Sequence, residues 1–386
     1  MIRIRKGIIT KLLIMIPLVF VIYVAMYIER GLIDHRHLNH LNLENISNSY
    51  PNTLMEISKL MEQKRVLKLN FTAVIIQSHY RSGSSLTGHI LQQHPDAFYL
   101  YEPLRAPMKF ISNRQEMEYP DGRIKKQPMD FNNEAKAIIR SLLTCDFLNV
   151  FSEIFLDDFI NTGSMSKKFT SCLREKKQKA ARLMKSSPKT ANDDFLMCVK
   201  YLRNICLHSK YRVLKIVRVP MEILVDIFDN TPSLKVLHLV RDPRAVIVSR
   251  KKFGSCDKNK TTNFKYGCTN EICQRLEDDI STKRILDPKY AGRIKTIFYE
   301  DVARRPVDMA KEMYAFVGMP IQQNMLNHVY DITLSGKKDD CAICTVRSNS
   351  SEHIMAWKKY LDKDSLYRIQ NRCNQVLKHY NYTIIS

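Results

Sequence analysis

Glycine and tryptophan are scarce in this chain, and acidic residues are fewer than basic ones. Only 11 of its 386 residues are glycine and one is tryptophan, whereas average usage would give about 27 glycines. A glycine that stands in a cluster of small residues is therefore a notable feature. The 39 acidic residues are outnumbered by 61 lysines and arginines, which leaves a net charge of +22. Such a surface favours polyanionic partners, namely nucleic acid, anionic lipid, phosphorylated nucleotides or acidic glycans.

Cysteine is too sparse for a small scaffold held together by disulfides. The chain has ten cysteines, an even number that still allows bridges. Apolar residues make up 45% and charged residues 26% of the sequence, which is typical of a packed globular protein and excludes wholesale disorder. At about 150 residues per domain, the length fits two or three domains, or one large α/β domain with appendages.

A long apolar run lies at the N-terminus. Residues 12–28 carry no charge, and the run from residue 7 approaches the roughly 20 residues that a helix needs to cross a bilayer. Three basic residues precede it, so the positive-inside rule predicts a cytosolic tail at 1–6, a transmembrane signal-anchor at 7–28 and a lumenal remainder. A cleaved signal peptide is the alternative, but the run ends without a clear small-x-small cleavage site.

Two further features agree with a lumenal body. All ten cysteines follow the apolar run, and disulfides form in oxidising compartments. Five asparagines stand in N-glycosylation sequons, namely Asn45, Asn70, Asn259, Asn349 and Asn381. A chain of this length should show a few sequons by chance, so they support the topology rather than any single glycosite.

The body of the chain has the pattern of an α/β protein. Residues 29–70 are polar with little periodicity and are interpreted as a stem. From residue 71 to the end at 386, short β-branched runs alternate with helix-like segments. The predicted strands lie at 72–77, 97–101, 212–219 and 234–240. This alternation predicts one domain with a largely parallel sheet that is covered on both faces.

The first chemical motif follows the strand at 72–77. Residues 81–87 read Arg-Ser-Gly-Ser-Ser-Leu-Thr, a loop of small residues that opens a helix. A strand–loop–helix junction of this kind directs backbone amides and the helix dipole at one point, which makes an anion site. Arg81 adds a permanent charge that can grip two oxygens.

This loop is related to the phosphate-binding loop of NTPases but lacks its key residues. Gly83 and Gly88 have the NTPase spacing, yet His89 and Ile90 stand where a lysine and a Ser or Thr are required. We therefore predict a phosphate cradle without the lysine and without the hydroxyl that binds Mg²⁺. An ordinary turn rich in serine and glycine is the alternative.

The second motif follows the predicted strand at 234–240. Asp242 is typical of a helix N-cap and Pro243 of the first helical position, so a helix should begin here. Arg241 falls at the carboxyl end of the strand, where open α/β sheets bind ligands. Ser249 lies about two turns into that helix. Together, Arg241 and Ser249 can hold a second phosphate.

In combination, these motifs resemble the Golgi carbohydrate sulfotransferases, in the branch that sulfates the 6-hydroxyl of galactose, N-acetylgalactosamine or N-acetylglucosamine. The resemblance spans about residues 71–382. Residues 81–87 resemble the 5′-phosphosulfate loop of the family and 239–250 its 3′-phosphate motif. Further matches lie at 94–104, 299–302, 314–318 and 345–350. The segment 161–220, the Cys341–Cys344 pair and the tail at 378–382 depart from the family pattern.

The resemblance implies a P-loop-like three-layer α/β sulfotransferase fold with a central, mostly parallel sheet, preceded by one transmembrane helix. It implies 3′-phosphoadenosine-5′-phosphosulfate as the donor, no metal, and a type II Golgi membrane protein with a lumenal catalytic domain. Two runs are assigned to the donor: Arg81, Ser82, Gly83, Ser84, Ser85, Leu86 and Thr87, and then Arg241, Asp242, Pro243, Arg244, Ala245, Val246, Ile247, Val248 and Ser249.

Sulfuryl transfer requires that the acceptor hydroxyl lie in line and that charge on the leaving phosphate be stabilised. Arg81 is assigned to that catalytic role. A general base should contribute roughly 10²- to 10⁴-fold, and Glu102 is the candidate, because the strand at 97–101 should end near the same sheet edge. A structural carboxylate paired with an arginine is the alternative for Glu102. His79 could also act as base, although a residue that caps the cradle is the favoured reading.

The positive charge is concentrated between the two donor motifs. Residues 161–220 hold fifteen basic and three acidic residues, a local charge of +12. We interpret this excess as a platform for an acidic glycan or glycoprotein acceptor, with Lys215 and Arg218 as acceptor-binding residues; a solvated charged face is the alternative. The predicted topology makes the Golgi membrane a partner and excludes nucleic acid, and a homodimer is left open.

Two other functions compete with the sulfotransferase. A metal-dependent Golgi glycosyltransferase would use a D-x-D motif, and Asp362 and Asp364 form one, although a solvated charged turn before a helix at 365–380 is the favoured interpretation. A non-catalytic membrane protein that binds glycans is the other. Cys341 and Cys344 form a CxxC without a second pair at zinc spacing, so a disulfide is favoured over a metal. The paired phosphate motifs favour the sulfotransferase.

Overall fold

The computed structural model describes residues 71–157, 163–182, 188–254, 256, 267–336 and 346–385. The predicted tail, anchor and stem at residues 1–70 lie outside these ranges, and so do three of the five sequons and the Cys341–Cys344 pair. Among the helices within the described ranges, none combines the length and the hydropathy that crossing a bilayer would need.

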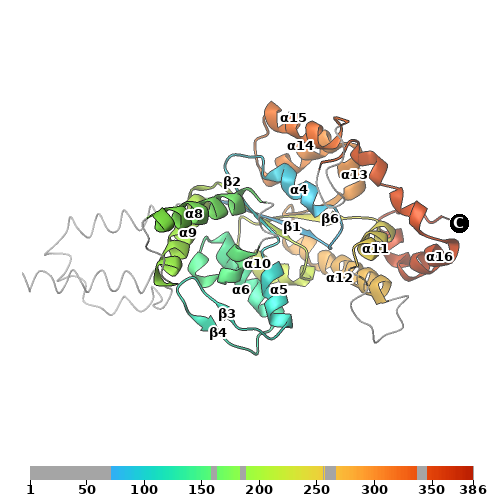
Figure 1. The fold of residues 1–386 in the computed structure, drawn as a ribbon. Helices are drawn as coiled ribbons and strands as arrows, with labels where there is room; N and C mark the ends of the chain where they lie inside the picture. The colour runs from blue at the N-terminus through green and yellow to red at the C-terminus, as the bar shows by residue number, and fades with distance from the viewer. Residues whose placement is uncertain are drawn as a thin grey trace, which may run out of the picture. The chain divides into compact units, whose positions relative to one another are not determined.

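The centre of the fold is a parallel sheet of five strands (Figure 1). Its strands are β1 (Thr72–Ser78), β2 (Ala97–Tyr101), β5 (Tyr211–Ile216), β6 (Lys235–Val240) and β7 (Ile294–Phe298). They are ordered β2-β5-β1-β6-β7, and all pairs are parallel. This confirms the predicted α/β fold with a central parallel sheet. The sequence did not predict β7 or the short antiparallel pair β3 (Met117–Glu118) and β4 (Ile124–Lys125).

Alternate residues of the central strand pack into two separate cores. Ala73 and Ile75 of β1 belong to one hydrophobic cluster, and Val74 and Ile76 to another, because successive side chains of a strand point to opposite faces. The first cluster includes residues of α6 (Phe131–Leu143), α8 (Ser164–Arg182), α9 (Pro188–His208) and α10 (Leu224–Asn230). The second includes α4 (Ser84–Leu91), α14 (Pro306–Val317) and α15 (Gln323–Thr333). Helices therefore cover both faces of the sheet, which makes three layers.

A third cluster lies beyond β6. It joins α11 (Pro243–Lys252), α12 (Gly267–Lys289), α16 (Lys363–Arg372) and α17 (Asn374–His379). The helix predicted at 365–380 is thus two helices that meet at Cys373, which is bonded to Cys273 of α12. The remaining helices are α5 (Arg105–Ser112), α7 (Ser152–Leu156) and α13 (Tyr299–Arg304), with 3₁₀ turns η2 (Phe147–Asn149), η4 (Met221–Ile223), η5 (Ser350–His353) and η6 (Ala356–Tyr360).

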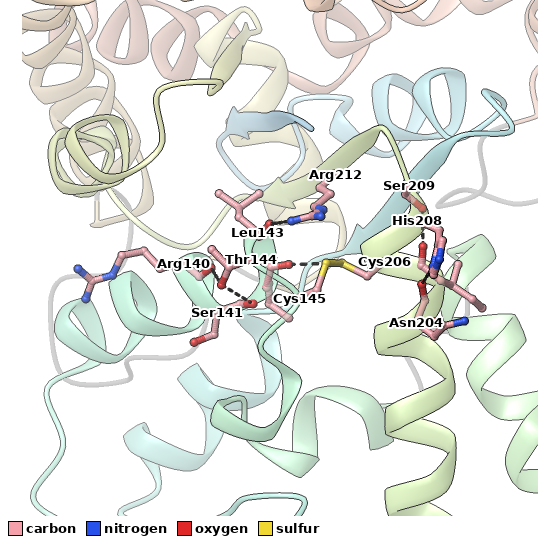
Figure 2. Close-up of a disulfide and its surroundings, with 12 residues drawn as sticks. Arg140, Ser141, Leu143, Thr144, Cys145, Asn204, Cys206, His208, Ser209 and Arg212 are labelled. Atoms are coloured by element: carbon pink, nitrogen blue, oxygen red, sulfur yellow. Dashed lines mark hydrogen bonds between the residues drawn. A yellow bond between two sulfur atoms is a disulfide. The ribbon is translucent and has the colours of Figure 1, made fainter. Parts of the chain in front are cut away.

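Disulfides fasten the helical segment that precedes β5. Cys145, just after α6, is bonded to Cys206 in the last turn of α9, and Cys172 of α8 to Cys198 of α9. Figure 2 shows the first of these bridges beside Arg212 of β5, whose Nη1 donates to the Leu143 carbonyl oxygen at 2.7 Å. The fourth bridge is Cys256–Cys268, so every cysteine in the described part of the chain is paired.

Gly88 allows α4 to lie directly against β2. A Cβ atom on Gly88 would stand 2.1 Å from the Tyr99 hydroxyl oxygen, and that hydroxyl is buried with no hydrogen-bond partner among the described residues. The glycine spacing that resembled an NTPase loop therefore has a packing role at its second position.

We expect Gly88→Ala to lower the free energy of unfolding by about 1–3 kcal/mol, the usual cost of overpacking a core. Tyr99→Phe should be nearly neutral alone, because it removes an unpaired buried hydroxyl, and it should recover part of the loss in the double variant. Urea denaturation of the three variants measures this, and strictly additive effects would show that the hydroxyl is not the obstacle.

Candidate functional site

The two predicted phosphate motifs lie side by side in the fold. One follows β1 and the other follows β6, and these strands are neighbours in the middle of the sheet. The strand of this sheet that follows β1 in sequence, β2, lies on the β1 side of the pair. The strand that follows β6, β7, lies on the β6 side. A crevice outside the carboxyl ends of two such strands is where open α/β sheets bind their ligands.

The loop after β1 has the backbone of an anion cradle. Arg81 and Gly83 have φ angles of 74° and 92°, in the left-handed region, and Ser82 N donates to the His79 carbonyl oxygen at 3.1 Å. Gly83 is the N-cap of α4, and the first amides of a helix have no partner within the helix. A Cβ on Gly83 would stand 2.2 Å from Cδ2 of Tyr299, so both the φ angle and the close approach require glycine.

The motif after β6 begins a helix as predicted. The Asp242 side chain accepts a hydrogen bond from Arg244 N at 2.9 Å, and Pro243 occupies the first turn of α11. The Arg244 guanidinium pairs with Asp242 at 2.8 Å and also donates to the Thr383 carbonyl oxygen. Asp242 and Arg244 therefore cap the helix and hold the C-terminal segment. Five apolar residues of the assigned runs are buried and have no side-chain group that could hydrogen-bond a ligand: Leu86, Pro243, Ala245, Val246 and Ile247.

The two motifs contact each other directly. Arg81 Nε donates to Ser249 Oγ at 2.9 Å, and Arg241 Nη1 donates to the Arg81 carbonyl oxygen at 3.0 Å. The Arg241 guanidinium lies 4.1 Å from the centroid of the Tyr299 ring, the same ring that packs on Gly83. Burial lowers the pKa of Arg81, and the charge of Arg241 lowers this pKa further. Two like charges held this close favour an anion between them.

A second charged cluster adjoins the cradle. Glu102 is buried, with a φ of 45°, at the end of β2. Its Oε1 accepts from Lys215 Nζ at 2.8 Å and its Oε2 from Arg218 Nη2 at 2.6 Å. Lys215 also donates to Ser85 Oγ at 3.2 Å and lies 3.6 Å from the centroid of the Tyr101 ring. A chain of contacts thus joins the first donor motif to the residues assigned to the acceptor.

The environment of Glu102 makes it a strong hydrogen-bond acceptor. Burial would raise its pKa, but the charges and hydrogen bonds of Lys215 and Arg218 outweigh burial, and the pKa lies below the ordinary value. The carboxylate is therefore charged, with both oxygens engaged. Glu102 therefore has the ion pairs expected of a structural carboxylate, which was the alternative to its role as general base. The role of general base stays a prediction.

Some buried donors around the cradle have no hydrogen-bond partner among the described residues. They are Thr87 Oγ1 in the first turn of α4, Nε of Arg241 and Nε of Arg218. Because buried polar atoms are nearly always paired, these donors fit an anionic ligand at the same edge of the sheet. The residues present therefore suit a phosphate-bearing donor.

The sequence reasoning missed the part played by Tyr299 and Glu300. Tyr299 supports both donor motifs, as described above. Glu300 accepts from Asp242 N at 3.0 Å through Oε1 and from the Tyr382 hydroxyl at 3.0 Å through Oε2. Burial raises the pKa of Glu300. The run at 299–302 matches the family pattern, but nothing in its sequence shows which side chains it contacts.

The D-x-D motif has a structural place in the fold. Asp362 caps α16 by accepting from Ser365 N at 2.7 Å, and Asp364 pairs with Arg368 at 2.8 Å. Within the described ranges, no three His, Cys, Asp or Glu side chains gather as a metal site would require. The motif therefore gives no support to a metal-bound nucleotide sugar.

Comparison with known proteins agrees with this geometry. Residues 73–323, well over half of the chain, match the model of the sulfotransferase family. Carbohydrate sulfotransferase 1 of Homo sapiens is 28% identical over 349 residues, which cover 81% of this chain and 80% of the relative. Carbohydrate sulfotransferase 4 of Mus musculus is 26% identical over 339 residues, 80% of this chain and 81% of the relative.

The sulfotransferase domain from the curacin biosynthetic pathway aligns with a TM-score of 0.47 and 16% identity, over 82% of this chain and 99% of that one. On the family match, the chain belongs to the sulfotransferase family. The protein is therefore a sulfotransferase enzyme, and the predicted resemblance to carbohydrate sulfotransferases is confirmed.

Proposed function

We propose that the protein transfers a sulfuryl group from 3′-phosphoadenosine-5′-phosphosulfate to the 6-hydroxyl of galactose, N-acetylgalactosamine or N-acetylglucosamine, in a glycosaminoglycan or a glycoprotein glycan. The observation that carries this is the direct contact between the two phosphate motifs, through Arg81, Ser249 and Arg241. One ligand with phosphates at two positions would account for both phosphate motifs and for their contact. The names of the most similar relatives support a carbohydrate acceptor.

The residues divide the work of this reaction. Arg81 and the amides at the start of α4 would hold the 5′-phosphosulfate, whereas Arg241 and Ser249 would hold the 3′-phosphate. The acceptor oxygen attacks sulfur, the bond from sulfur to the 5′-phosphate oxygen breaks, and adenosine 3′,5′-bisphosphate leaves. Arginines at the phosphates stabilise the charge that develops on the leaving group. The acceptor hydroxyl loses its proton to a base, for which Glu102 remains the candidate.

We place this activity in the Golgi lumen, on a type II membrane protein. The apolar run at 7–28 and the four disulfides support the placement, because structural disulfides form in the secretory pathway and are rare in the cytosol. The positive charge of the chain supports an acidic glycan as acceptor.

Transfer of ³⁵S from labelled donor to a panel of acceptors tests the proposal. We expect label on chondroitin, keratan or glycans that end in N-acetylglucosamine, with the sulfate at carbon 6 on linkage analysis, and no requirement for added metal. Label on carbon 3 or 4, or on none of these sugars, would contradict the proposed acceptor. Retention on immobilised adenosine 3′,5′-bisphosphate in EDTA tests the donor separately.

A further inference from the structure

Asp279 of α12 is a buried carboxylate outside both donor motifs. Its side chain is about as buried as the hydrophobic core, with a relative exposure of 1% for the residue. Oδ2 lies 2.8 Å from His79 Nε2, and Oδ1 accepts a hydrogen bond from Met221 N at 3.2 Å. A buried charge needs such partners to be tolerated, so the two contacts fix the positions of the segments that supply them.

Each partner belongs to a segment that enters the site. His79 is the first residue after β1, and its carbonyl oxygen accepts from Ser82 N within the cradle loop. Met221 begins η4, three residues after Arg218, which grips Glu102. Asp279 therefore joins the donor loop to the segment on the acceptor side.

A second contact strengthens the same link. Gln77 of β1 donates from Nε2 to the Val219 carbonyl oxygen at 3.1 Å. The segment from Arg218 to Met221 is thus held by β1 on one side and by α12 on the other. The helix that carries Asp279, α12, also packs against α11, the helix of the second donor motif.

The nearest partners of the Asp279 carboxylate are the His79 ring and the Met221 amide. His238 Nε2 lies farther away, at 3.8 Å, and neither ring nitrogen of His238 has a hydrogen-bond partner in the described part of the chain. Burial lowers the pKa of His238 to about 4, so this ring is neutral at neutral pH. Burial would raise the pKa of Asp279, but His79, His238 and the Met221 amide together outweigh burial, and the pKa is lowered.

We propose that Asp279 and His79 are positioning residues, which set the donor loop against the Arg218 segment so that the sulfuryl group and the acceptor hydroxyl lie in line. The inference rests on the proposed function for the acceptor, because Arg218 is assigned to that side. In reactions that depend on positioning, a displacement of 1 Å can cost about 100-fold in rate. The effect should therefore appear in kcat and leave donor affinity in place.

The test compares Asp279→Asn with Asp278→Asn on the full chain. Asp278 is the matched control, because it is the neighbouring carboxylate on the same helix, and its exposed side chain accepts a hydrogen bond from Gln274 Nε2 at 3.0 Å. We expect Asp279→Asn to lower kcat about 10- to 100-fold, with the dissociation constant for adenosine 3′,5′-bisphosphate changed less than about 3-fold by calorimetry. Asp278→Asn should leave both values unchanged.

Two further measurements separate positioning from loss of structure. His79→Gln keeps a hydrogen-bond donor and should lower kcat in the same direction, and the double variant should lose less than the product of the single losses, because the two residues act as a unit. Slow hydrolysis of the donor by water, measured without acceptor, should persist in Asp279→Asn. A kcat loss that only matches the unfolded fraction in a thermal melt, or an equal loss of donor affinity, would overturn the proposal.

Failure of the proposed function would look different. A wild-type enzyme that labels no sugar on the panel would refute the carbohydrate acceptor. The positioning role would then be tested with whichever acceptor the wild type does sulfate, by the same comparison of kcat with donor affinity. Equal kcat values for wild type and Asp279→Asn on that acceptor would refute the positioning role alone.

Discussion

Arg241→Ala is expected to weaken binding of adenosine 3′,5′-bisphosphate by about 30- to 150-fold, which corresponds to roughly 2–3 kcal/mol for hydrogen bonds from a charged donor. Under the proposed function the side chain has a double role, because it is assigned to the 3′-phosphate and also donates to the Arg81 carbonyl oxygen and lies over the Tyr299 ring. Calorimetry with the bisphosphate measures the loss. Arg81→Ala should behave in the same way.

The matched control for this experiment is Arg304→Ala. Arg304 is an exposed arginine on α13, and its pairing with Asp301 at 3.3 Å is of the surface kind that contributes little. The Arg304→Ala variant removes the same charge from the protein without changing the cradle. Donor affinity that is equal in Arg241→Ala, Arg304→Ala and wild type would refute the assignment of the second motif.

Glu102→Gln is expected to lower kcat by about 10²- to 10⁴-fold if Glu102 is the general base, with donor affinity kept. The ion pairs give this variant a second effect. Lys215 and Arg218 keep their positive charges when the carboxylate becomes an amide, and breaking a buried pair in this way costs about 3–5 kcal/mol. Urea denaturation at pH 7 should therefore show a lower free energy of unfolding.

The dependence of stability on pH identifies the contribution of the Glu102 ion pairs. The pKa of Glu102 is lower in the folded protein than in the unfolded chain, so its stabilising effect is present above the unfolded value of about 4.3 and is lost as the pH falls through the folded value. The difference between wild type and Glu102→Gln should then shrink from pH 7 towards strongly acidic pH. A difference that stays constant would exclude the ion pairs as its cause.

The two effects of Glu102→Gln can be separated. If kcat falls by no more than a few-fold while stability falls as expected, the role of Glu102 is to hold Lys215 and Arg218 in place. Another group, or water, then takes the proton. Because both carboxylate oxygens already accept hydrogen bonds, this outcome would assign the carboxylate a purely structural role. Full loss of kcat in a folded variant would support the base.

The central sheet could be predicted because its signals are local. The strand at 97–101 has the predicted bounds, and Asp242 and Pro243 begin a helix as their types favour. β7 was missed because it is an edge strand whose residues are mostly half-buried, with Lys295 and Thr296 in its middle. The strand predicted at 212–219 ends at Ile216 instead. Its last residues leave the sheet to bring Arg218 to Glu102, and β-branched letters alone do not show that departure.

The two anion-binding motifs of the site could be predicted from the sequence, but the side-chain contacts between distant segments could not. The run at 81–87 and the motif at 241–249 carry local signatures of anion binding, and the order of the strands brings them together. The contact between Arg81 and Ser249 spans 168 positions in sequence, and the link from His79 to Asp279 spans 200. Pairs of this kind depend on which strands become neighbours, so no pattern along the chain reveals them.

The two bridges before β5 close a long stretch of the chain onto itself. Cys145–Cys206 closes the chain across 61 positions, and Cys172–Cys198 fastens α8 to α9 inside that closed stretch. The bridge and the hydrogen bond from Arg212 hold the base of this stretch against β5 (Figure 2). The stretch is also part of the core, because Phe147, Phe169 and Leu202 within it belong to the first hydrophobic cluster beside the sheet. Exchanges on its exposed surface should therefore change stability little, whereas exchanges at these buried positions should disturb the packing against the sheet.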